Sequence, residues 1–424
     1  MPSRAPTRFR RVLRVTGRLV LALVLVAAGY VGYVWWRHDR PVTLVAPSGR
    51  HPVGRRTLTW TDRGRTDALA PHRGPRRLSV WLWYPAASGV GRSGPPAPYA
   101  PGGWRQLHLP APVGIGETGF AKLRTHSRSN APVAAGRFPV VVLEPGLGFS
   151  APQYQSLAED LASHGYLVAG VTPTYSANLT VLDGRPVRSD QAGNPSGFDG
   201  GRSRAALATS RRLLAVWVAD ARFAAREVAR LDRRGPFAGH VVAGRTLYLG
   251  HSFGGAAALQ ACAEDRGCVG AVDLDGGEYG SVTRTGLRAP LMLVGHDNSC
   301  VTGTCDPAAA GDRPDRRVAR RLLDRSRGPA WTVTLADSAH FSFTDYADYY
   351  LAAPLRFLVP LGSVDGRAGL RLTAGYLAAF ADRATTGHGS GLLQPGRHRV
   401  GSATATVAGV RPGRTPEQRA HAAG

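Results

Sequence analysis

Ser252 stands in a sequence pattern that is typical of a nucleophilic serine. The stretch Leu247–Cys262 reads LYLGHSFGGAAALQAC, with a glycine two residues before and two residues after the serine. A strand-like run, Thr246–Leu249, precedes the serine, and Ala256–Ala263, rich in helix-favouring alanine, follows it. A sharp strand-to-helix turn lifts a serine hydroxyl clear of the backbone, and a Cβ at either glycine would crowd that turn. In a chain with 53 glycines the motif alone is weak, but its setting makes Ser252 the candidate nucleophile.

Two further residues could activate this serine. A serine hydroxyl becomes a good nucleophile when an imidazole accepts its proton and a carboxylate orients that imidazole. Asp275 ends the next apolar run, in AVDLDGG, and His340 follows the last one, in ADSAHFSF. The order Ser, Asp, His at the ends of successive strands is that of α/β-hydrolases. We therefore predict that Ser252, Asp275 and His340 form a catalytic triad.

Asp297 is an alternative acid. It lies in VGHDNSC, after the strand that follows the one ending at Asp275, where many α/β-hydrolases carry their carboxylate. It also precedes Cys300 by three residues, and Asp-Asn-Ser is a sequence common in turns. A structural role in a small loop therefore competes with a catalytic role for Asp297.

An oxyanion hole needs two backbone donors. In this fold one is the N–H of the residue after the nucleophile, here Phe253. The other comes from a loop after an earlier strand, and EPGLGF, which follows FPVVVL, fits that place. The N–H of Leu147 is the candidate, because the glycines on either side permit the turn that would aim it. The alternative for this segment is an ordinary tight turn.

The net charge of +24 suggests a nucleic-acid binder at first sight, but the pattern of charges does not. Lys122 is the only lysine, and the arginines are spread along the chain rather than gathered into one basic stripe. The sequence has no zinc-finger spacing, H-E-x-x-H, Walker loop or G-x-G-x-x-G after a strand. We expect no nucleic-acid partner, no cofactor and no metal ion.

The N-terminus predicts a membrane anchor. Residues 1–18 contain six arginines, and residues 19–36 carry no charge and end in tyrosines and tryptophans. At ~1.5 Å rise per residue, such a run just spans a bilayer core, and its basic flank should stay in the cytoplasm. We therefore expect a single-pass anchor in the cell membrane with the catalytic domain outside the cytoplasm. The alternative is secretion after cleavage of a signal peptide, with Val26-Ala27-Ala28 as the cleavage site.

The cysteines agree with export. The four cysteines fall into two close pairs, Cys262 with Cys268 and Cys300 with Cys305. An even count in an exported protein suggests disulfides, and the spacings are not those of a zinc site. Two local bridges are expected, with free thiols as the alternative.

Strand and helix patterns alternate along residues 45–385, which predicts one α/β domain with a mostly parallel sheet and helices on both faces. Residues 172–201 lack periodicity and are interpreted as a loop over the site. Residues 386–424 have little apolar content and are interpreted as a mostly disordered tail. The expected strands are 56–62, 76–86, 138–146, 166–172, 246–249, 269–275, 290–295 and 330–336, and the expected helices are 153–165, 203–233, 256–263, 313–324 and 369–383.

Taken together, these motifs resemble the platelet-activating-factor acetylhydrolase family of α/β-hydrolases, as a bacterial, membrane-anchored member. No single motif is very specific, but their joint order is. The motifs are GHSFGG around Ser252, DLDG ending at Gly276, PGLG upstream, H-x-x-F-x-D over His340–Asp345, WYPA, HPVG followed by TWTD, and LASHG.

The resemblance implies a metal-free serine esterase that cuts short or oxidised acyl groups from phospholipid-like esters. It implies that Ser252, Asp275 and His340 form the triad and that the N–H groups of Leu147 and Phe253 form the oxyanion hole. The DLDG match favours Asp275 over Asp297. One departure is GEYGS after DLDG, which lacks the bulky apolar residues of the animal enzymes.

The sequence therefore predicts an ester hydrolase acting on short-chain or lipid-like substrates. A cutinase-like polyester or triglyceride hydrolase, which the GHSFGG and PGLG elements also resemble, is the second hypothesis. A catalytically silent hydrolase fold that binds lipid at the membrane is the third.

Overall fold

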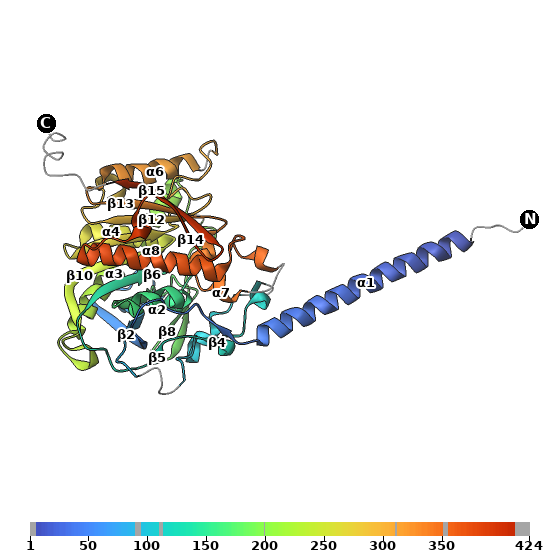
Figure 1. Ribbon diagram of the computed structural model, residues 1–424, viewed down its shortest axis with the longest axis horizontal. Helices are drawn as coiled ribbons and strands as arrows, with labels where there is room; N and C mark the ends of the chain where they lie inside the picture. Colours follow the sequence, from blue (N-terminus) through green and yellow to red (C-terminus); the bar gives the residue numbers. More distant parts are fainter. Residues whose placement is uncertain are drawn as a thin grey trace, which may run out of the picture.

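A computed structural model describes residues 6–89, 95–109, 113–198, 200–309, 312–350 and 355–411. In this part of the chain one sheet of 11 strands forms the centre of the domain (Figure 1). Its strand order is β14-β15-β13-β12-β11-β10-β6-β7-β3-β2-β5. The six central strands from β13 to β7 run parallel, whereas β3 and β15 pair antiparallel to their inner neighbours. The predicted mostly parallel α/β fold is confirmed.

The strands of this sheet are β2 Val53–Thr66, β3 Pro75–Pro85, β5 Arg128–Ser129, β6 Phe138–Glu144, β7 Leu167–Thr172, β10 Val241–His251, β11 Cys268–Leu274, β12 Leu291–His296, β13 Ala330–Leu335, β14 Gly396–Val400 and β15 Ala403–Arg411. Two short pairs lie outside it: β1 Val42–Thr43 with β4 Leu123–Arg124, and β8 Leu179–Leu182 with β9 Arg185–Arg188.

Alternating side chains of the central strands fill two separate cores, one on each face of the sheet. On β6, Val141 and Leu143 belong to the core that contains α2 and α8, whereas Val140 and Val142 belong to the core that contains α3 and α4. Strands that are apolar on both faces need helices on both faces, which is the arrangement in Figure 1. The helices of the domain are α2 Gln155–Ser163, α3 Arg204–Leu231, α4 Phe253–Glu264, α5 Val282–Thr285, α6 Asp312–Arg325, α7 Tyr346–Tyr349 and α8 Gly366–Thr386.

Short 3₁₀ turns connect these elements. They are η2 Gly102–Leu107, η3 Val113–Gly116, η4 Phe120–Lys122, η5 Ala151–Tyr154, η6 Gly235–Phe237, η7 His340–Phe343, η8 Leu355–Leu358 and η9 Gly391–Leu393. The β8–β9 hairpin falls within residues 172–201, which the sequence indicated only as a loop.

The interpretation of residues 386–424 as a mostly disordered tail is wrong for the described part. Strand β15 pairs with β13, and β14 pairs with β15, so that both extend the central sheet. Ala403, Ala405 and Val407 alternate along β15 and are buried against the core. Small apolar residues suffice here because backbone pairing with β13 contributes to the stability of the strand. Residues 412–424 lie outside the described residues.

Both predicted disulfides are present. Cys262 is bonded to Cys268, with Cα atoms 5.1 Å apart, and Cys300 to Cys305, with Cα atoms 4.7 Å apart. The described residues contain no free cysteine. Disulfides are typical of compartments outside the cytoplasm.

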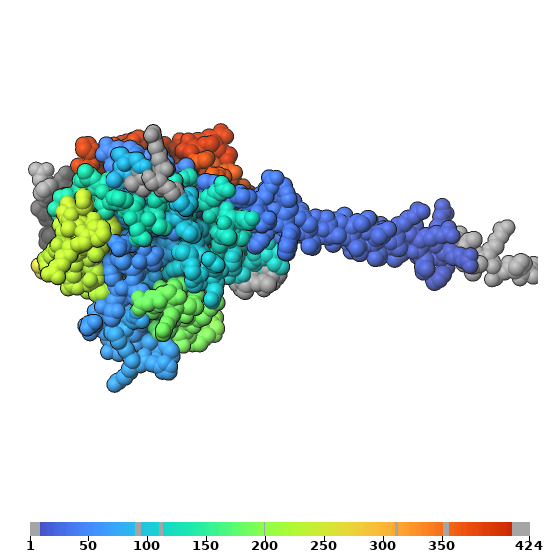
Figure 2. Space-filling view, turned by 90° about the horizontal axis from the view of Figure 1, so that it is seen from below, coloured from blue at the N-terminus to red at the C-terminus, as the bar shows by residue number. Residues whose placement is uncertain are grey.

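A long helix, α1 Pro6–Asp39, projects away from the domain (Figures 1 and 2). Its segment Phe9–Asp39 is long and apolar enough to cross a membrane, and no other helix in the described ranges is. Near an N-terminus this composition fits either a membrane anchor or a signal sequence.

Candidate active site

The turn that carries Ser252 is a strained elbow between β10 and α4. Ser252 has φ 55° and ψ −125°, a backbone conformation rare for a residue with a side chain. A Cβ at Gly250 would lie 2.0 Å from the carbonyl oxygen of Gly254, and one at Gly254 would lie 2.2 Å from that of Pro145. Both glycines of the motif are therefore required by close backbone contacts, as the sequence pattern predicted.

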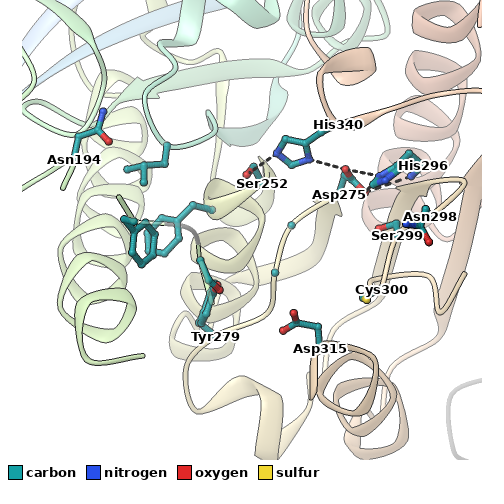
Figure 3. Close-up of a pocket in the computed structure, with 16 residues that line it drawn as sticks. Asn194, Ser252, Asp275, Tyr279, His296, Asn298, Ser299, Cys300, Asp315 and His340 are labelled. Atoms are coloured by element: carbon teal, nitrogen blue, oxygen red, sulfur yellow. Dashed lines mark hydrogen bonds and ion pairs between the residues drawn. The ribbon is translucent and has the colours of Figure 1, made fainter. Parts of the chain in front are cut away.

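His340 lies between Ser252 and Asp275 (Figure 3). Its Nε2 is 2.9 Å from Ser252 Oγ, and its Nδ1 is 2.6 Å from Asp275 Oδ2. Ser252 follows β10, Asp275 follows the neighbouring β11, and His340 follows β13, so parallel strand ends bring the three residues to one edge of the sheet. With Nδ1 donating to the carboxylate, Nε2 is free to accept the serine proton.

A second histidine holds the same carboxylate. His296, at the end of β12, donates from Nδ1 to Asp275, with 2.8 Å to each carboxylate oxygen, and its main-chain N–H lies 3.3 Å from Oδ1. Burial by itself would raise the pKa of Asp275, but hydrogen bonds from His296 and His340 hold it well below its usual range. Asp275 is therefore a carboxylate at neutral pH.

The sequence analysis did not select His296. The sequence pattern could have indicated it, because His296 ends β12, the strand that pairs in parallel with β11. The ends of adjacent parallel strands lie close together, so His296 is placed near Asp275. Burial lowers the pKa of His296, but the hydrogen bond and charge of Asp275 outweigh it, so that the net shift is upward.

Among the hydrogen bonds and ion pairs of the described residues, none joins Asp297, the alternative acid, to His340. Asp297 is exposed, and its Oδ2 accepts a hydrogen bond from the main-chain N–H of Asp337. Asp337 belongs to the loop that leads from β13 to His340. Asp297 thus anchors the histidine loop from outside, while Asp275 makes the direct contact.

The two candidate oxyanion donors line the same pocket as Ser252. Phe253 begins α4, so its N–H is one of the helix's unpaired first-turn donors. Leu147 lies in the turn after β6, between Gly146 and Gly148, and Gly148 has φ 83°. Among the hydrogen bonds of the described residues, none is donated by the N–H of Leu147 or Phe253. Neither N–H therefore has a protein acceptor among the described residues.

A buried hydrogen-bond relay connects the loops that carry these groups. The Tyr154 hydroxyl accepts from the N–H of Gly146 at 2.9 Å and lies 2.8 Å from His251 Nδ1. His251 Nε2 lies 2.9 Å from the main-chain oxygen of His340. Burial, with a smaller contribution from His340, lowers the pKa of His251 to about 3. A neutral ring with its proton on Nε2 satisfies both contacts.

The comparisons with known proteins agree with this geometry. The sequence model of a family described as platelet-activating factor acetylhydrolase, isoform II, matches residues 107–184, which include the oxyanion-loop candidate Leu147. A solved ferulic acid esterase from Streptomyces cinnamoneus is 31% identical; the similarity covers 83% of this chain and 96% of that one, with a TM-score of 0.65.

This chain belongs to the platelet-activating factor acetylhydrolase-like family of α/β-hydrolase esterases. The family resemblance predicted from the motifs is confirmed. No curated protein matches the chain.

The pocket beside Ser252 in this esterase has a volume of about 520 Å³. One wall is aromatic, with the Phe253 ring 6.3 Å from that of Phe198 and 5.8 Å from that of Tyr279. The opposite wall is polar and contains Asn298 and Ser299. Tyr279, in the GEYGS segment, lines this pocket (Figure 3).

A second pocket, of about 720 Å³, lies against the other side of the oxyanion loop and shares Leu147 and Asn194 with the first. Its lining includes Phe149, Phe341 and Tyr346. The two pockets thus meet at Leu147. The described residues contain no group of three His, Cys, Asp or Glu side chains that could hold a metal ion.

Proposed function

We propose that this esterase is a membrane-anchored serine carboxylic-ester hydrolase whose triad is Ser252, Asp275 and His340. The observation that carries the proposal is the continuous hydrogen-bonded chain from Ser252 Oγ through both ring nitrogens of His340 to Asp275. The strained elbow and the free donors beside it support the same assignment.

In the proposed reaction Ser252 Oγ attacks the ester carbonyl while His340 Nε2 takes its proton. The charge that develops on the carbonyl oxygen is stabilised by the N–H groups of Leu147 and Phe253. The imidazolium, stabilised by Asp275, then gives its proton to the departing alcohol, leaving an acyl-enzyme. Water, deprotonated by His340, attacks the acyl-enzyme and releases the carboxylic acid and the free serine.

For the substrate we propose short-chain or lipid-like esters, as the family likeness suggests. The pocket of about 520 Å³ beside Ser252 is large enough for a short acyl group. The aromatic wall of Phe198, Phe253 and Tyr279 favours a second candidate, an aromatic acid ester of the ferulate type, in line with the name of the Streptomyces cinnamoneus relative. A cutinase-like activity on polyester or triglyceride stays a third prediction.

For the location we propose that α1 anchors the domain outside the cytoplasm, rather than being cleaved as a signal peptide. The length of the apolar run supports this, because the run continues for eight residues, 29–36, beyond the possible cleavage site at Ala28. Cleavage after Ala28 would leave the last turns of α1 on the domain but remove most of the apolar span.

A fluorophosphonate probe tests the enzyme assignment. We expect covalent labelling of the full-length protein at Ser252, and no labelling of the Ser252→Ala variant. Hydrolysis of p-nitrophenyl acetate, a short-chain phosphatidylcholine, methyl ferulate and tributyrin then ranks the candidate substrates. A folded protein that neither reacts with the probe nor hydrolyses any of these esters would contradict the proposal in favour of a silent lipid-binding fold.

A further inference from the structure

Three exposed apolar side chains of the domain gather at the base of α1. Among the described residues, every other exposed large hydrophobic side chain belongs to α1 itself. The three are Ile115 of η3, 52% exposed, and Phe357 and Leu358 of η8, 89% and 52% exposed. We call Ile115, Phe357 and Leu358 the juxtamembrane patch. A soluble protein normally buries such an apolar cluster. Its exposure therefore indicates a surface that contacts something other than water.

The patch is continuous with the apolar surface of α1. Ile115 lines an apolar pocket together with Val31 and Trp35 of α1, and η8 packs against η3. In Figure 2, α1 leaves the domain beside the segments that precede residue 130, which include η3. The outer surface of α1 remains apolar up to Trp36, where Trp35 is 77% and Trp36 47% exposed.

The junction between α1 and the domain is fixed by several contacts, not joined by a loose linker. The carbonyl of His38 accepts from the N–H of Gly119 at 3.0 Å, and the His38 ring donates to the carbonyl of Glu117 at 2.6 Å. Lys122 pairs with Asp39 at 3.1 Å. Strand β1, which begins three residues after Asp39, pairs with β4. The depth of α1 therefore sets the depth of the patch.

Charges mark the level of the bilayer surface. Arg37 follows the two tryptophans directly and Arg40 lies three residues further on, with its guanidinium 4.0 Å from the ring centre of Trp36. Tryptophans followed by arginines are typical of the interface between lipid tails and headgroups. Ile115 contacts α1 at this same level, because it shares a pocket with Trp35 and His38.

We propose that the juxtamembrane patch inserts into the interfacial layer of the outer leaflet, so that the catalytic domain lies against the bilayer in a fixed orientation. This proposal rests on the proposed anchoring by α1. The occupant of the patch is phospholipid, because in the described part of the chain the exposed apolar surface that continues from it is the one that α1 presents to lipid.

The test uses the full-length protein in phosphatidylcholine nanodiscs. An environment-sensitive nitrobenzoxadiazole label is placed at position 357 through Phe357→Cys, and in a second sample at position 320 through Arg320→Cys. Arg320 is an exposed residue of α6, which Figure 1 shows away from α1. Phosphatidylcholine carrying a doxyl group at carbon 5 of one chain serves as the quencher. We expect at least threefold stronger quenching at position 357 than at position 320, with a blue-shifted emission.

Flotation of the unlabelled protein with lipid separates the two proposals. Flotation with equal quenching at positions 357 and 320 would overturn the patch and leave the anchor in place. A protein that does not float refutes both the anchor and the patch. A blue shift at position 357 that rises with protein concentration in lipid-free detergent would assign the patch to a second copy of the chain and also overturn the proposal.

A functional readout follows from the same geometry. The variant Phe357→Ser/Leu358→Ser should hydrolyse a dissolved ester such as p-nitrophenyl acetate as fast as the unmodified protein. Its rate on a short-chain phosphatidylcholine embedded in vesicles should fall at least threefold. An unchanged rate on the embedded substrate, or an equal loss on both substrates in a variant that unfolds at the same temperature as the unmodified protein, would contradict the proposal.

Discussion

The ring of His251 donates a hydrogen bond from Nε2 to the main-chain carbonyl of His340. The residue before the candidate nucleophile thus holds the backbone of the candidate base. Because Tyr154 joins His251 to the oxyanion loop at Gly146, one buried relay sets the spacing of all three loops.

We predict that Tyr154→Phe lowers kcat about tenfold with little change in KM. The substitution leaves the Gly146 N–H without its acceptor and His251 without its donor, a buried loss of ~1–3 kcal/mol. Tyr166→Phe is the matched control, because Tyr166 is a buried tyrosine whose hydroxyl contacts Asp382 away from the site. Steady-state kinetics and denaturant unfolding of both variants check this. If the two variants lose stability alike and neither loses kcat, the relay is structural only.

Ser252→Ala should reduce kcat by about 10⁶-fold, the loss typical of a triad nucleophile. The fold should be preserved, because the strained turn is held by its glycine contacts and not by the hydroxyl. Thermal unfolding and ester hydrolysis of the purified variant test both parts. Appreciable turnover by a well-folded Ser252→Ala protein would refute the mechanism.

Asp275→Asn and Asp297→Asn should separate the acid from its neighbour. Asp275→Asn should cost about 10⁴-fold in kcat, because the amide favours the wrong tautomer of His340. Asp297→Asn should cost less than about tenfold, since an amide oxygen can still accept from the Asp337 N–H. Comparison of kcat for the two variants decides the assignment, and the reverse order of losses would move the acid to Asp297.

Replacement of His296, the second histidine at Asp275, should make the free energy of unfolding depend less on pH. Although burial lowers the pKa of His296, Asp275 raises it in net, so the folded state favours the imidazolium. The stabilisation is therefore complete below the ordinary imidazole pKa of ~6.5 and is lost as pH rises through the higher folded-state value. The difference in unfolding free energy between the unmodified protein and His296→Gln should shrink as pH increases across this window. The same change at the exposed His72 is the control, and a difference that grows with pH would contradict the interpretation.

The strands and the Ser252 elbow could be predicted because local pattern determines them. Continuous β-branched runs such as Val140–Val142 indicate a strand buried on both faces, and Gly250 and Gly254 indicate a turn with no room for a Cβ. The contact of His340 with Asp275 follows from the order of parallel strands, which fixes where their ends meet.

Other features depend on contacts that local pattern does not show. Strand β15, ATATVAGVR, has few large apolar side chains and becomes ordered through its pairing with β13. The relay through Tyr154 and His251 joins residues 97 positions apart, and neither residue type is diagnostic alone. The role of His296 is visible only once β11 and β12 are known to be neighbours.

The pairing of β15 with β13 also means that part of the site's support is synthesised last. The N–H of Ala336, four residues before His340, donates to the carbonyl of Thr404 at 2.9 Å. The segment that leads to the histidine thus receives part of its support from nearly the last described residues of the chain. During synthesis Ser252 and Asp275 emerge long before this support does. A chain still being made or exported therefore carries Ser252 and Asp275 well before the segment that leads to His340 can pair with β15.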